Sequence, residues 1–174
     1  MTKTTAGLHY QPYYCEENIW QLCQNPQYAD GQVLFISGYG EHFAMLCQQG
    51  GEGKGHLVCW DYHVVMLHAG NILDFNSTLP FSTPFEEYFA WSFIDERLLP
   101  EDLIPMFRVI PAGKFVESFL SDRRHMKTEQ GWSAPPPPWP LISRSSSNLS
   151  RFADMWDLEF GEVMNLSEVL ERFG

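Results

Sequence analysis

Three residues of types that could perform hydrolysis stand out along the chain, namely Cys15, His63 and Asp74. Cys15 follows Tyr13 and Tyr14 and begins a helix-like stretch, whereas His63 and Asp74 lie on two strand-like segments. A thiol at a helix start, an imidazole base and an orienting carboxylate form the nucleophilic site of thiol hydrolases and acyl transferases. Since a helix N-terminus and an imidazolium both lower a thiol's pKa, we expect Cys15 to rest as a thiolate paired with His63. The pattern therefore indicates an enzyme.

The strand register after His63 decides whether Asp74 can serve as its partner. A tight turn at Gly70-Asn71 would place Asp74 four residues out of register, about 13 Å along the strand from its partner. A four-residue connection over residues 67–70 would instead place the two side chains opposite each other on one face. We predict the second register, because a buried aspartate without a partner costs free energy.

The alternation of helical and extended patterns predicts an α/β fold of the α+β kind. We expect a single catalytic domain over residues 1–174, with a twisted, mostly antiparallel sheet flanked by helices. Thr83 is predicted as the N-cap of a helix that begins at Pro84. The other predicted elements are helices over residues 15–24, 115–120 and 166–173 and strands over residues 33–36, 72–75 and 107–110.

The segment Leu57–Met66 is rich in aromatic and β-branched residues, which predicts one long central strand. Its alternation places Asp61 and His63 on one face. Trp60 and Tyr62 fall on the opposite face, where we expect them to pack in the core.

Length and charge limit the kinds of partner. A chain of 174 residues is long enough to bury roughly 70% of its unfolded surface around one core. The net charge of −11 repels nucleic acid and anionic lipid and favours cationic groups such as a peptide α-amine. We therefore expect no nucleic-acid or membrane partner. Residues 1–7 have no apolar stretch of signal-peptide length, so we expect a cytosolic or nuclear protein. We also expect the protein to be a monomer.

The cysteines carry no metal-binding spacing. Cys15, Cys23, Cys47 and Cys59 contain no C-x-x-C pair, which predicts free thiols and neither a zinc site nor a thioredoxin-type motif. We expect no metal and no organic cofactor. The glycine-rich residues 50–55 are predicted to form a flexible loop, because their spacing is too irregular for a phosphate-binding fingerprint.

Five separate motifs follow one another in a characteristic order. They are Tyr14–Trp20, Trp60–Val65, the Asp74 strand leading to Leu79-Pro80-Phe81, Ser121-Asp122-Arg123 with His125-Met126, and the tract Pro135–Pro138. In order and spacing they resemble the protein N-terminal glutamine amidohydrolase family, over nearly the whole chain. The resemblance implies a transglutaminase-type α/β core and a Cys15-His63-Asp74 triad that converts the N-terminal glutamine of proteins or peptides to glutamate without a cofactor. It also implies that the product glutamate marks proteins for arginylation and turnover.

Substrate specificity in such an enzyme needs a reader for the free α-amine. The carboxylates nearest to the thiol in sequence are Glu16, Glu17 and Asp61. Asparagine would be rejected because it is one methylene shorter, which also withdraws its carbonyl from the thiolate. The chain departs from the family pattern at Asn76, where an acidic residue is usual, and in a shorter hairpin after His63.

Two other functions stay open. The same triad could transfer an acyl group to an amine or cleave peptide bonds, as in transglutaminase-like and papain-like proteins. The prolines at 135–138 could instead make the chain a non-catalytic interaction module, although the family match favours a wall of the fold. His68 and His125 are expected to be structural, and Arg123 is expected to pair with an internal carboxylate.

Overall fold

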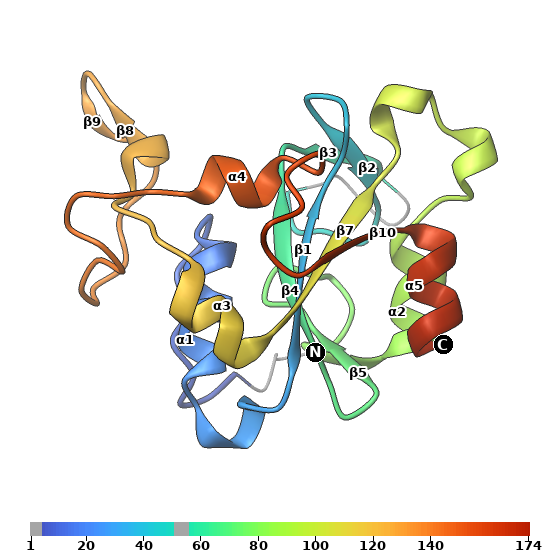
Figure 1. Cartoon of the computed structure of the whole chain (residues 1–174), viewed down its shortest axis with the longest axis horizontal. Helices are drawn as coiled ribbons and strands as arrows, with labels where there is room; N and C mark the ends of the chain where they lie inside the picture. Colours follow the sequence, from blue (N-terminus) through green and yellow to red (C-terminus); the bar gives the residue numbers. More distant parts are fainter. Residues whose placement is uncertain (1–4, 51–55) are drawn as a thin grey trace.

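The computed structural model describes residues 5–50 and 56–174, and a six-stranded sheet forms its centre (Figure 1). Every strand of this sheet pairs antiparallel with its neighbours. Its order is β10 (Glu162–Asn165), β7 (Met106–Pro111), β1 (Gln32–Ser37), β4 (His63–His68), β5 (Asn71–Leu73) and β6 (Ser82–Pro84). Two short ladders join β2 (Phe43–Met45) to β3 (Val58–Trp60) and β8 (Lys127–Thr128) to β9 (Gly131–Trp132). The predicted antiparallel sheet is confirmed, whereas the loop predicted over residues 50–55 lies outside the described residues except for Gly50.

Helices cover both faces of the sheet (Figure 1). One face carries α1 (Cys15–Cys23), α3 (Ala112–Ser118) and α4 (Leu149–Ala153), and the other carries α2 (Phe85–Ser92) and α5 (Leu166–Phe173). Along β1, Val33 and Phe35 enter the first core, and Leu34 and Ile36 enter the second. A strand covered on both faces must be a continuous apolar run, which explains this sequence. Single 3₁₀ turns are η1 (Pro26–Tyr28), η2 (Glu96–Leu98), η3 (Glu101–Leu103) and η4 (Arg124–Met126).

The segment Leu57–Met66 is not the single strand that we predicted. Its first part is β3, which pairs with β2 outside the main sheet through Cys59 and Ala44. The chain leaves this ladder after Trp60 and enters the main sheet at His63, the first residue of β4. Both parts favour extended structure, but they pair with different partners. The catalytic candidate His63 therefore stands at the end of a central strand.

The hairpin between β4 and β5 differs from both registers considered from the sequence. His68 pairs with Asn71, so the turn consists of Ala69 and Gly70. Their φ values of 50° and 79° are those of a two-residue type I′ turn. The predicted four-residue connection is wrong, and so is the alternative tight turn one position later.

Asp74 nevertheless reaches His63. Since Leu73 pairs with Met66, Asp74 is level with Val65, two residues from His63 and on the same face. Such diagonal neighbours lie about 7–8 Å apart at Cα, within reach of long side chains. The ladder ends at Leu73, and the Asp74 backbone N–H donates to the carbonyl of Phe81 at 3.0 Å.

Helix α2 starts one residue later than predicted. Pro84 is its N-cap, and no side chain caps it. Thr83, the predicted N-cap, belongs to β6, and its hydroxyl donates to the Pro80 carbonyl at 2.8 Å. The predicted helix at the end of the chain is confirmed as α5, whose first turn is capped by the side chain of Asn165.

A buried arginine fixes the segment that follows α4. Arg108 of β7 is fully buried and makes no ion pair among the described residues. Its guanidinium donates to the carbonyls of Phe152, Phe160 and Asp154 at 2.9, 2.7 and 2.8 Å. The bonds to Phe152 and Asp154 satisfy carbonyls at the end of α4, and together with the bond to Phe160 they hold a segment that borders the site described below.

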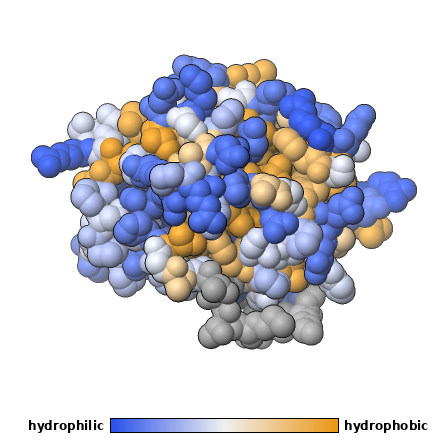
Figure 2. Space-filling view, turned by 90° about the horizontal axis from the view of Figure 1, so that it is seen from below, coloured by the Kyte–Doolittle hydropathy of each residue, from blue (hydrophilic) through white to orange (hydrophobic). Residues whose placement is uncertain are grey.

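On the face that Figure 2 displays, hydrophobic side chains are interspersed among hydrophilic ones. Among the described residues, no helix has the length and apolar character needed to cross a membrane.

Candidate active site

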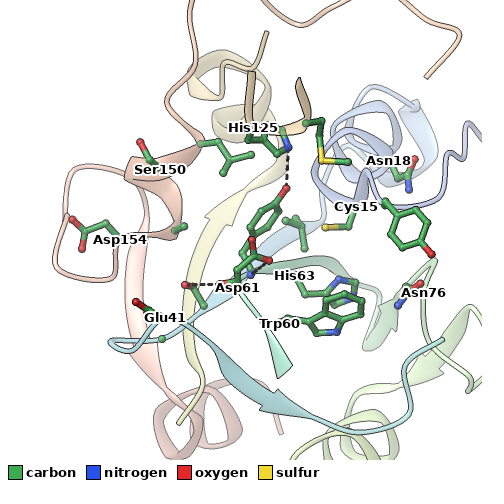
Figure 3. Close-up of a pocket in the computed structure, with 18 of the residues that line it drawn as sticks. Cys15, Asn18, Glu41, Trp60, Asp61, His63, Asn76, His125, Ser150 and Asp154 are labelled. Atoms are coloured by element: carbon green, nitrogen blue, oxygen red, sulfur yellow. Dashed lines mark hydrogen bonds between the residues drawn. The ribbon is translucent and has the colours of Figure 1, made fainter. Parts of the chain in front are cut away.

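A pocket of about 620 Å³ lies beside the start of α1 (Figure 3). Its walls come from α1, the loop after β1, the β3–β4 junction, the segment after β5, the η4 turn and the α4 region. Of the six residues proposed from the sequence, Cys15, His63, Asp74 and Asp61 line it. The structure thus gathers the three triad candidates in one place, from three different elements.

The start of α1 is held firmly. Tyr14 is the N-cap, and its buried hydroxyl donates to the Ala134 carbonyl at 3.0 Å. The Asn18 side chain accepts from the Gln11 backbone N–H at 2.8 Å and donates to the Gln11 carbonyl at 3.0 Å. Cys15 is the first helical residue, where backbone N–H groups have no partner within the helix. Its thiol is thus fixed beside free hydrogen-bond donors.

His63 and Asp74 form a buried pair. The Nε2 atom of His63 lies 3.0 Å from Oδ1 of Asp74, and both side chains are nearly inaccessible. The same carboxylate accepts the Tyr88 hydroxyl at 2.7 Å, the Gln48 amide at 2.9 Å and the Asn76 backbone N–H at 2.8 Å. Because Asp74 occupies Nε2, the nitrogen left for proton exchange with a thiol is Nδ1.

The hydrogen-bond partners of Asp74 determine whether its carboxyl group is ionised. Burial by itself raises the pKa of a carboxyl group. The charge of His63 and the hydrogen bonds from His63, Gln48 and Tyr88 outweigh it, so that the pKa of Asp74 lies well below its usual range. Asp74 is therefore a fixed anion that can orient the imidazole and stabilise its protonated form.

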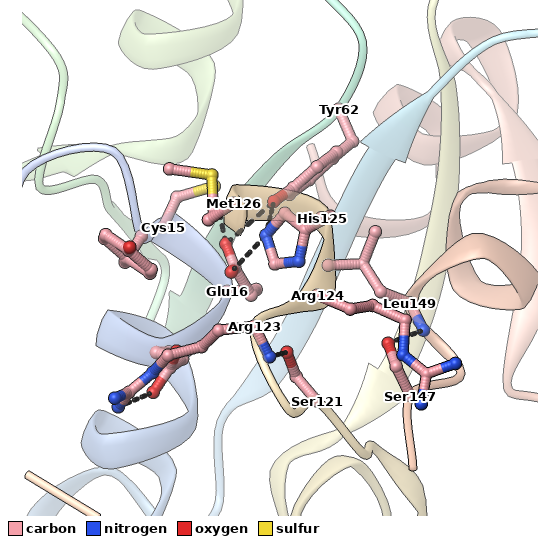
Figure 4. A network of polar contacts seen from close by, with 12 residues as sticks. Cys15, Glu16, Tyr62, Ser121, Arg123, Arg124, His125, Met126, Ser147 and Leu149 are labelled. Atoms are coloured by element: carbon pink, nitrogen blue, oxygen red, sulfur yellow. Dashed lines mark hydrogen bonds and ion pairs between the residues drawn. The ribbon is translucent and has the colours of Figure 1, made fainter. Parts of the chain in front are cut away.

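A second polar network lies on the other side of Cys15 (Figure 4). Glu16 is fully buried, and its Oε2 accepts the Tyr62 hydroxyl at 3.0 Å and lies 3.7 Å from the Cys15 sulfur. The Nε2 atom of His125 lies 3.2 Å from Glu16 Oε1 and 3.2 Å from the Tyr62 hydroxyl. Since that hydroxyl donates to Glu16, it accepts from the histidine. We call Glu16, Tyr62 and His125 the second network.

The sequence did not reveal this network. Tyr62 and Trp60 were expected to pack in the core; each packs against one of the two cores, and both also line the pocket. The strand break at Asp61 ends the alternation that placed them on the face opposite His63. Trp60 instead stacks on the ring of His63, with centroids 6.1 Å apart. His125, expected to be structural, also lines the pocket.

The surroundings of the Cys15 thiol disfavour its thiolate. Burial raises the pKa of Cys15 well above its ordinary value. The negative charges of Glu16, Asp74 and Asp61 raise this pKa further, and a backbone hydrogen bond at Val64 only partly offsets them. The expected resting thiolate is therefore not supported. The two acids in the first turn of α1 counteract the helix dipole that favoured it.

Glu17 is committed to a structural ion pair. It is buried and accepts two hydrogen bonds from Arg123, both at 2.8 Å, and one from the Trp139 indole at 3.0 Å. Arg123 also donates to the Trp139 carbonyl at 3.1 Å. The predicted internal partner of Arg123 is thus found. With its oxygens engaged and buried, Glu17 is poorly placed to bind a substrate amine, which disfavours that candidate role.

Asp61 is the exposed acid nearest to the centre of the pocket in Figure 3. Its Oδ1 accepts the Tyr62 backbone N–H at 2.9 Å, and its own carbonyl accepts the Ser37 hydroxyl at 3.2 Å. These bonds fix the residue while its carboxylate stays accessible to a cation. Glu41 and Asp154 line the pocket farther from Cys15. Within the described residues, no group of three or more His, Cys, Asp or Glu side chains could hold a metal ion.

Comparison with known proteins identifies the family of this chain. Residues 10–173 match the sequence profile of a family described as N-terminal glutamine amidase. The chain belongs to that family. It is 37% identical to the protein N-terminal glutamine amidohydrolase of Homo sapiens over 196 aligned residues, which cover 97% of this chain and 95% of the relative. It is 35% identical to the protein of that name from Drosophila ananassae, covering 97% of this chain and 89% of the relative.

Two features noted from the resemblance to the amidase family have a clear place in the structure. Asn76, the first of them, donates its side-chain amide to Gln48 Oε1 at 2.9 Å, beside Asp74. The proline tract lies against the start of α1, where the Gln11 amide donates to the Pro135 carbonyl at 3.0 Å. In this member of the N-terminal glutamine amidase family, the tract therefore supports the helix that carries Cys15.

Proposed function

We propose that this chain hydrolyses the side-chain amide of an N-terminal glutamine in proteins or peptides, giving glutamate and ammonia, with Cys15 as the nucleophile. The observation that supports it most is the buried His63–Asp74 pair in the pocket that Cys15 lines. Membership of the N-terminal glutamine amidase family supports the choice of substrate. Residues 1–174 would act as one catalytic domain with a transglutaminase-like arrangement of the triad.

Because burial and the neighbouring acids raise the pKa of Cys15 and so favour its thiol form, His63 would act first as a general base. Nδ1 takes the thiol proton while the sulfur attacks the amide carbon, and the helix-start N–H groups stabilise the oxyanion. The imidazolium then gives this proton to the departing ammonia, and the C–N bond breaks to leave a thioester. A water molecule attacks the thioester after losing a proton to His63, and that proton returns to the sulfur. Asp74 holds the imidazole tautomer throughout.

Recognition of the α-amine would fall to Asp61. Its carboxylate is exposed in the pocket and lies on the β3–β4 junction, directly before Tyr62 and His63. Glu16, also a candidate, is completely buried and occupied by Tyr62, so it acts behind the pocket wall. A cationic amine would be attracted to this cluster of negative charge, whereas an acetylated terminus would not.

Ammonia release from short peptides tests the proposal. We expect release from a peptide that begins with Gln, and little from peptides with N-terminal Asn, acetylated Gln or internal Gln. Cys15→Ala should be inactive, and Asp61→Asn should lower kcat/KM about tenfold through the loss of one charged hydrogen bond. Efficient release from acetylated or internal Gln, or transfer of the acyl group to an added amine, would favour the acyl transferase instead. Full activity in Cys15→Ala would overturn the cysteine mechanism.

The setting of the enzyme is part of the proposal. The four cysteines are free thiols, as is usual in a reducing compartment, which supports a cytosolic or nuclear location. Its glutamate product would then mark the substrate for turnover, as the family resemblance implies.

A further inference from the structure

The second oxygen of Asp74 is held by two side chains outside the triad. Oδ2 accepts the hydroxyl of Tyr88 at 2.7 Å and the side-chain amide of Gln48 at 2.9 Å. Tyr88 comes from α2, and Gln48 comes from the segment that follows β2. Both side chains are buried, with exposed fractions of 0% and 3%. These are contacts of the interior, which solvent cannot replace.

The chemistry of these groups fixes the direction of each hydrogen bond. An ionised carboxylate only accepts, so Gln48 must turn its NH₂ group toward Asp74. The carbonyl oxygen Oε1 of Gln48 then faces Asn76, which must present a hydrogen-bond donor to it. The side-chain nitrogen Nδ2 of Asn76 is that donor, at 2.9 Å from Oε1. The order Asn76 to Gln48 to Asp74 is therefore the one that leaves no acceptor facing another acceptor. A carboxylate at position 76 would break this order.

We propose that Asn76 and Gln48 form an amide relay that positions Asp74, and through it the base His63. Asn76 acts twice, since its backbone N–H also donates to Asp74 Oδ1 at 2.8 Å. Neither amide touches the reacting atoms, so both are positioning residues. The inference rests on the proposed function, in which His63 moves the proton.

The relay can be removed without dismantling its surroundings. The segments that carry Gln48 and Asn76 are tied by backbone hydrogen bonds, from Gln49 N–H to the Asn76 carbonyl and from Thr78 N–H to the Cys47 carbonyl, both at 2.8 Å. Gln48 and Ser77 also form an isolated antiparallel bridge. Truncating the two amide side chains leaves all of these bonds in place.

Loss of the relay should change the response of the site to pH. With fewer donors the Asp74 carboxylate becomes more basic, so it stabilises the imidazolium more strongly. The acid limb of activity then moves to higher pH. The other titratable groups that influence Asp74 or its ligand Tyr88, unchanged in every variant, are Cys15, Tyr10 and Cys47.

The test is a double-mutant cycle of Asn76→Ala and Gln48→Leu. Each single variant should lower kcat about tenfold or less, the effect of weakening a hydrogen bond to a charged group. KM for the Gln peptide should stay nearly constant, and the acid limb of kcat/KM should move upward. Asn76→Ala should add nothing in the Gln48→Leu background. Asn71→Ala removes a comparable amide that donates to Ser82, and it should leave activity and pH profile unchanged.

Equal effects of Asn76→Ala in both backgrounds, or an unmoved acid limb, would overturn the relay. Thermal unfolding of each variant identifies a loss of activity that comes only from misfolding. Tyr88→Phe removes the other donor to Asp74 Oδ2 and should also move the acid limb to higher pH. NMR titration of the His63 ring reports the relay without turnover. If wild-type protein released no ammonia, the proposed function would fail while this titration still decided the relay.

Discussion

Cys15 lies between two carboxylate–histidine pairs that differ in how completely they are held. Asp74 with His63 is buried, and donors from Tyr88, Gln48 and Asn76 surround the carboxylate. In the second network, the carboxylate is buried but its histidine is partly accessible, with 22% of the side chain exposed.

Two carboxylate–imidazole pairs in one pocket can therefore have different roles, according to how tightly each pair is held. A histidine whose partner is fixed on every side has one orientation, as a general base requires. A histidine at the pocket surface can contact substrate, while the carboxylate behind it adds negative charge next to the thiol. The first pair therefore suits the proposed catalytic role, and the second would shape the electrostatic field around Cys15.

Replacing the histidine of each pair should separate the pairs most strongly. His63→Ala should lower kcat/KM for a Gln peptide by about 10³-fold or more, because only binding and oxyanion stabilisation remain. His125→Ala should lower it by about tenfold or less, the loss expected for one hydrogen-bonded contact. Steady-state ammonia release measures both. Similar losses in the two variants would erase the distinction between the pairs.

The contribution of the buried Glu17–Arg123 ion pair can be tested through the stability of the fold. Arg123→Met leaves Glu17 charged and buried without its partner, which should lower the unfolding free energy by about 3–5 kcal/mol. Urea unfolding measures the loss, and the double variant Glu17→Gln/Arg123→Met should recover part of it. Arg97→Met breaks the exposed pair with Asp95 and should leave stability nearly unchanged. A stable Arg123→Met single variant would show that the pair does not hold the fold.

Removing the negative charge of Glu16 in the second network should make the Cys15 thiol easier to ionise. Because Glu16 raises the pKa of Cys15, Glu16→Gln lowers that pKa and increases the thiolate fraction at neutral pH. Alkylation of Cys15 by iodoacetamide at pH 7 should accelerate about three- to tenfold, since one pKa unit changes the fraction tenfold. Mass spectrometry of the Cys15 peptide gives the rate. The control is Asp30→Asn, which removes an exposed acid paired with His68. An unchanged alkylation rate in Glu16→Gln would show that Glu16 does not raise the pKa of Cys15.

The smallest effect is expected from the hydroxyl of the second network. Tyr62→Phe keeps the ring that stacks with Phe35 and removes the hydroxyl that donates to Glu16 and accepts from the partly exposed His125. We expect kcat/KM to fall by about threefold, in the range of a single hydrogen bond. A loss as large as that of His63→Ala would instead place Tyr62 in the chemistry.

Local patterns in the sequence predicted individual elements better than they predicted how those elements pair. The start of α1 at Cys15 and the antiparallel sheet follow from local patterns, and both are found as predicted. The hairpin register was wrong because the turn uses Ala69 in the left-handed region, which its residue type does not favour. Pairing of β4 with its neighbours decides that turn, and a local pattern does not contain this pairing.

The second network was missed for a related reason. Leu57–Met66 has uniform strand propensity, so nothing local marks Asp61 as the point where the chain changes partners. Glu17 is a first-turn acid as its position in the sequence indicates, but its partner Arg123 lies 106 residues away. Such pairings are properties of the folded chain, and composition and periodicity do not encode them.

The Glu17–Arg123 bond has a consequence for the order in which activity arises. All three triad residues lie within the first 74 positions, yet the helix that carries the thiol is clamped by residues 123 and 139. Contacts between such distant positions form late, because closing a long loop costs entropy before the contact rewards it. During synthesis the chain would therefore possess Cys15, His63 and Asp74 long before the contacts that hold α1 in place. The Cys15 thiol thus stays unorganised until the polypeptide that confines it has emerged.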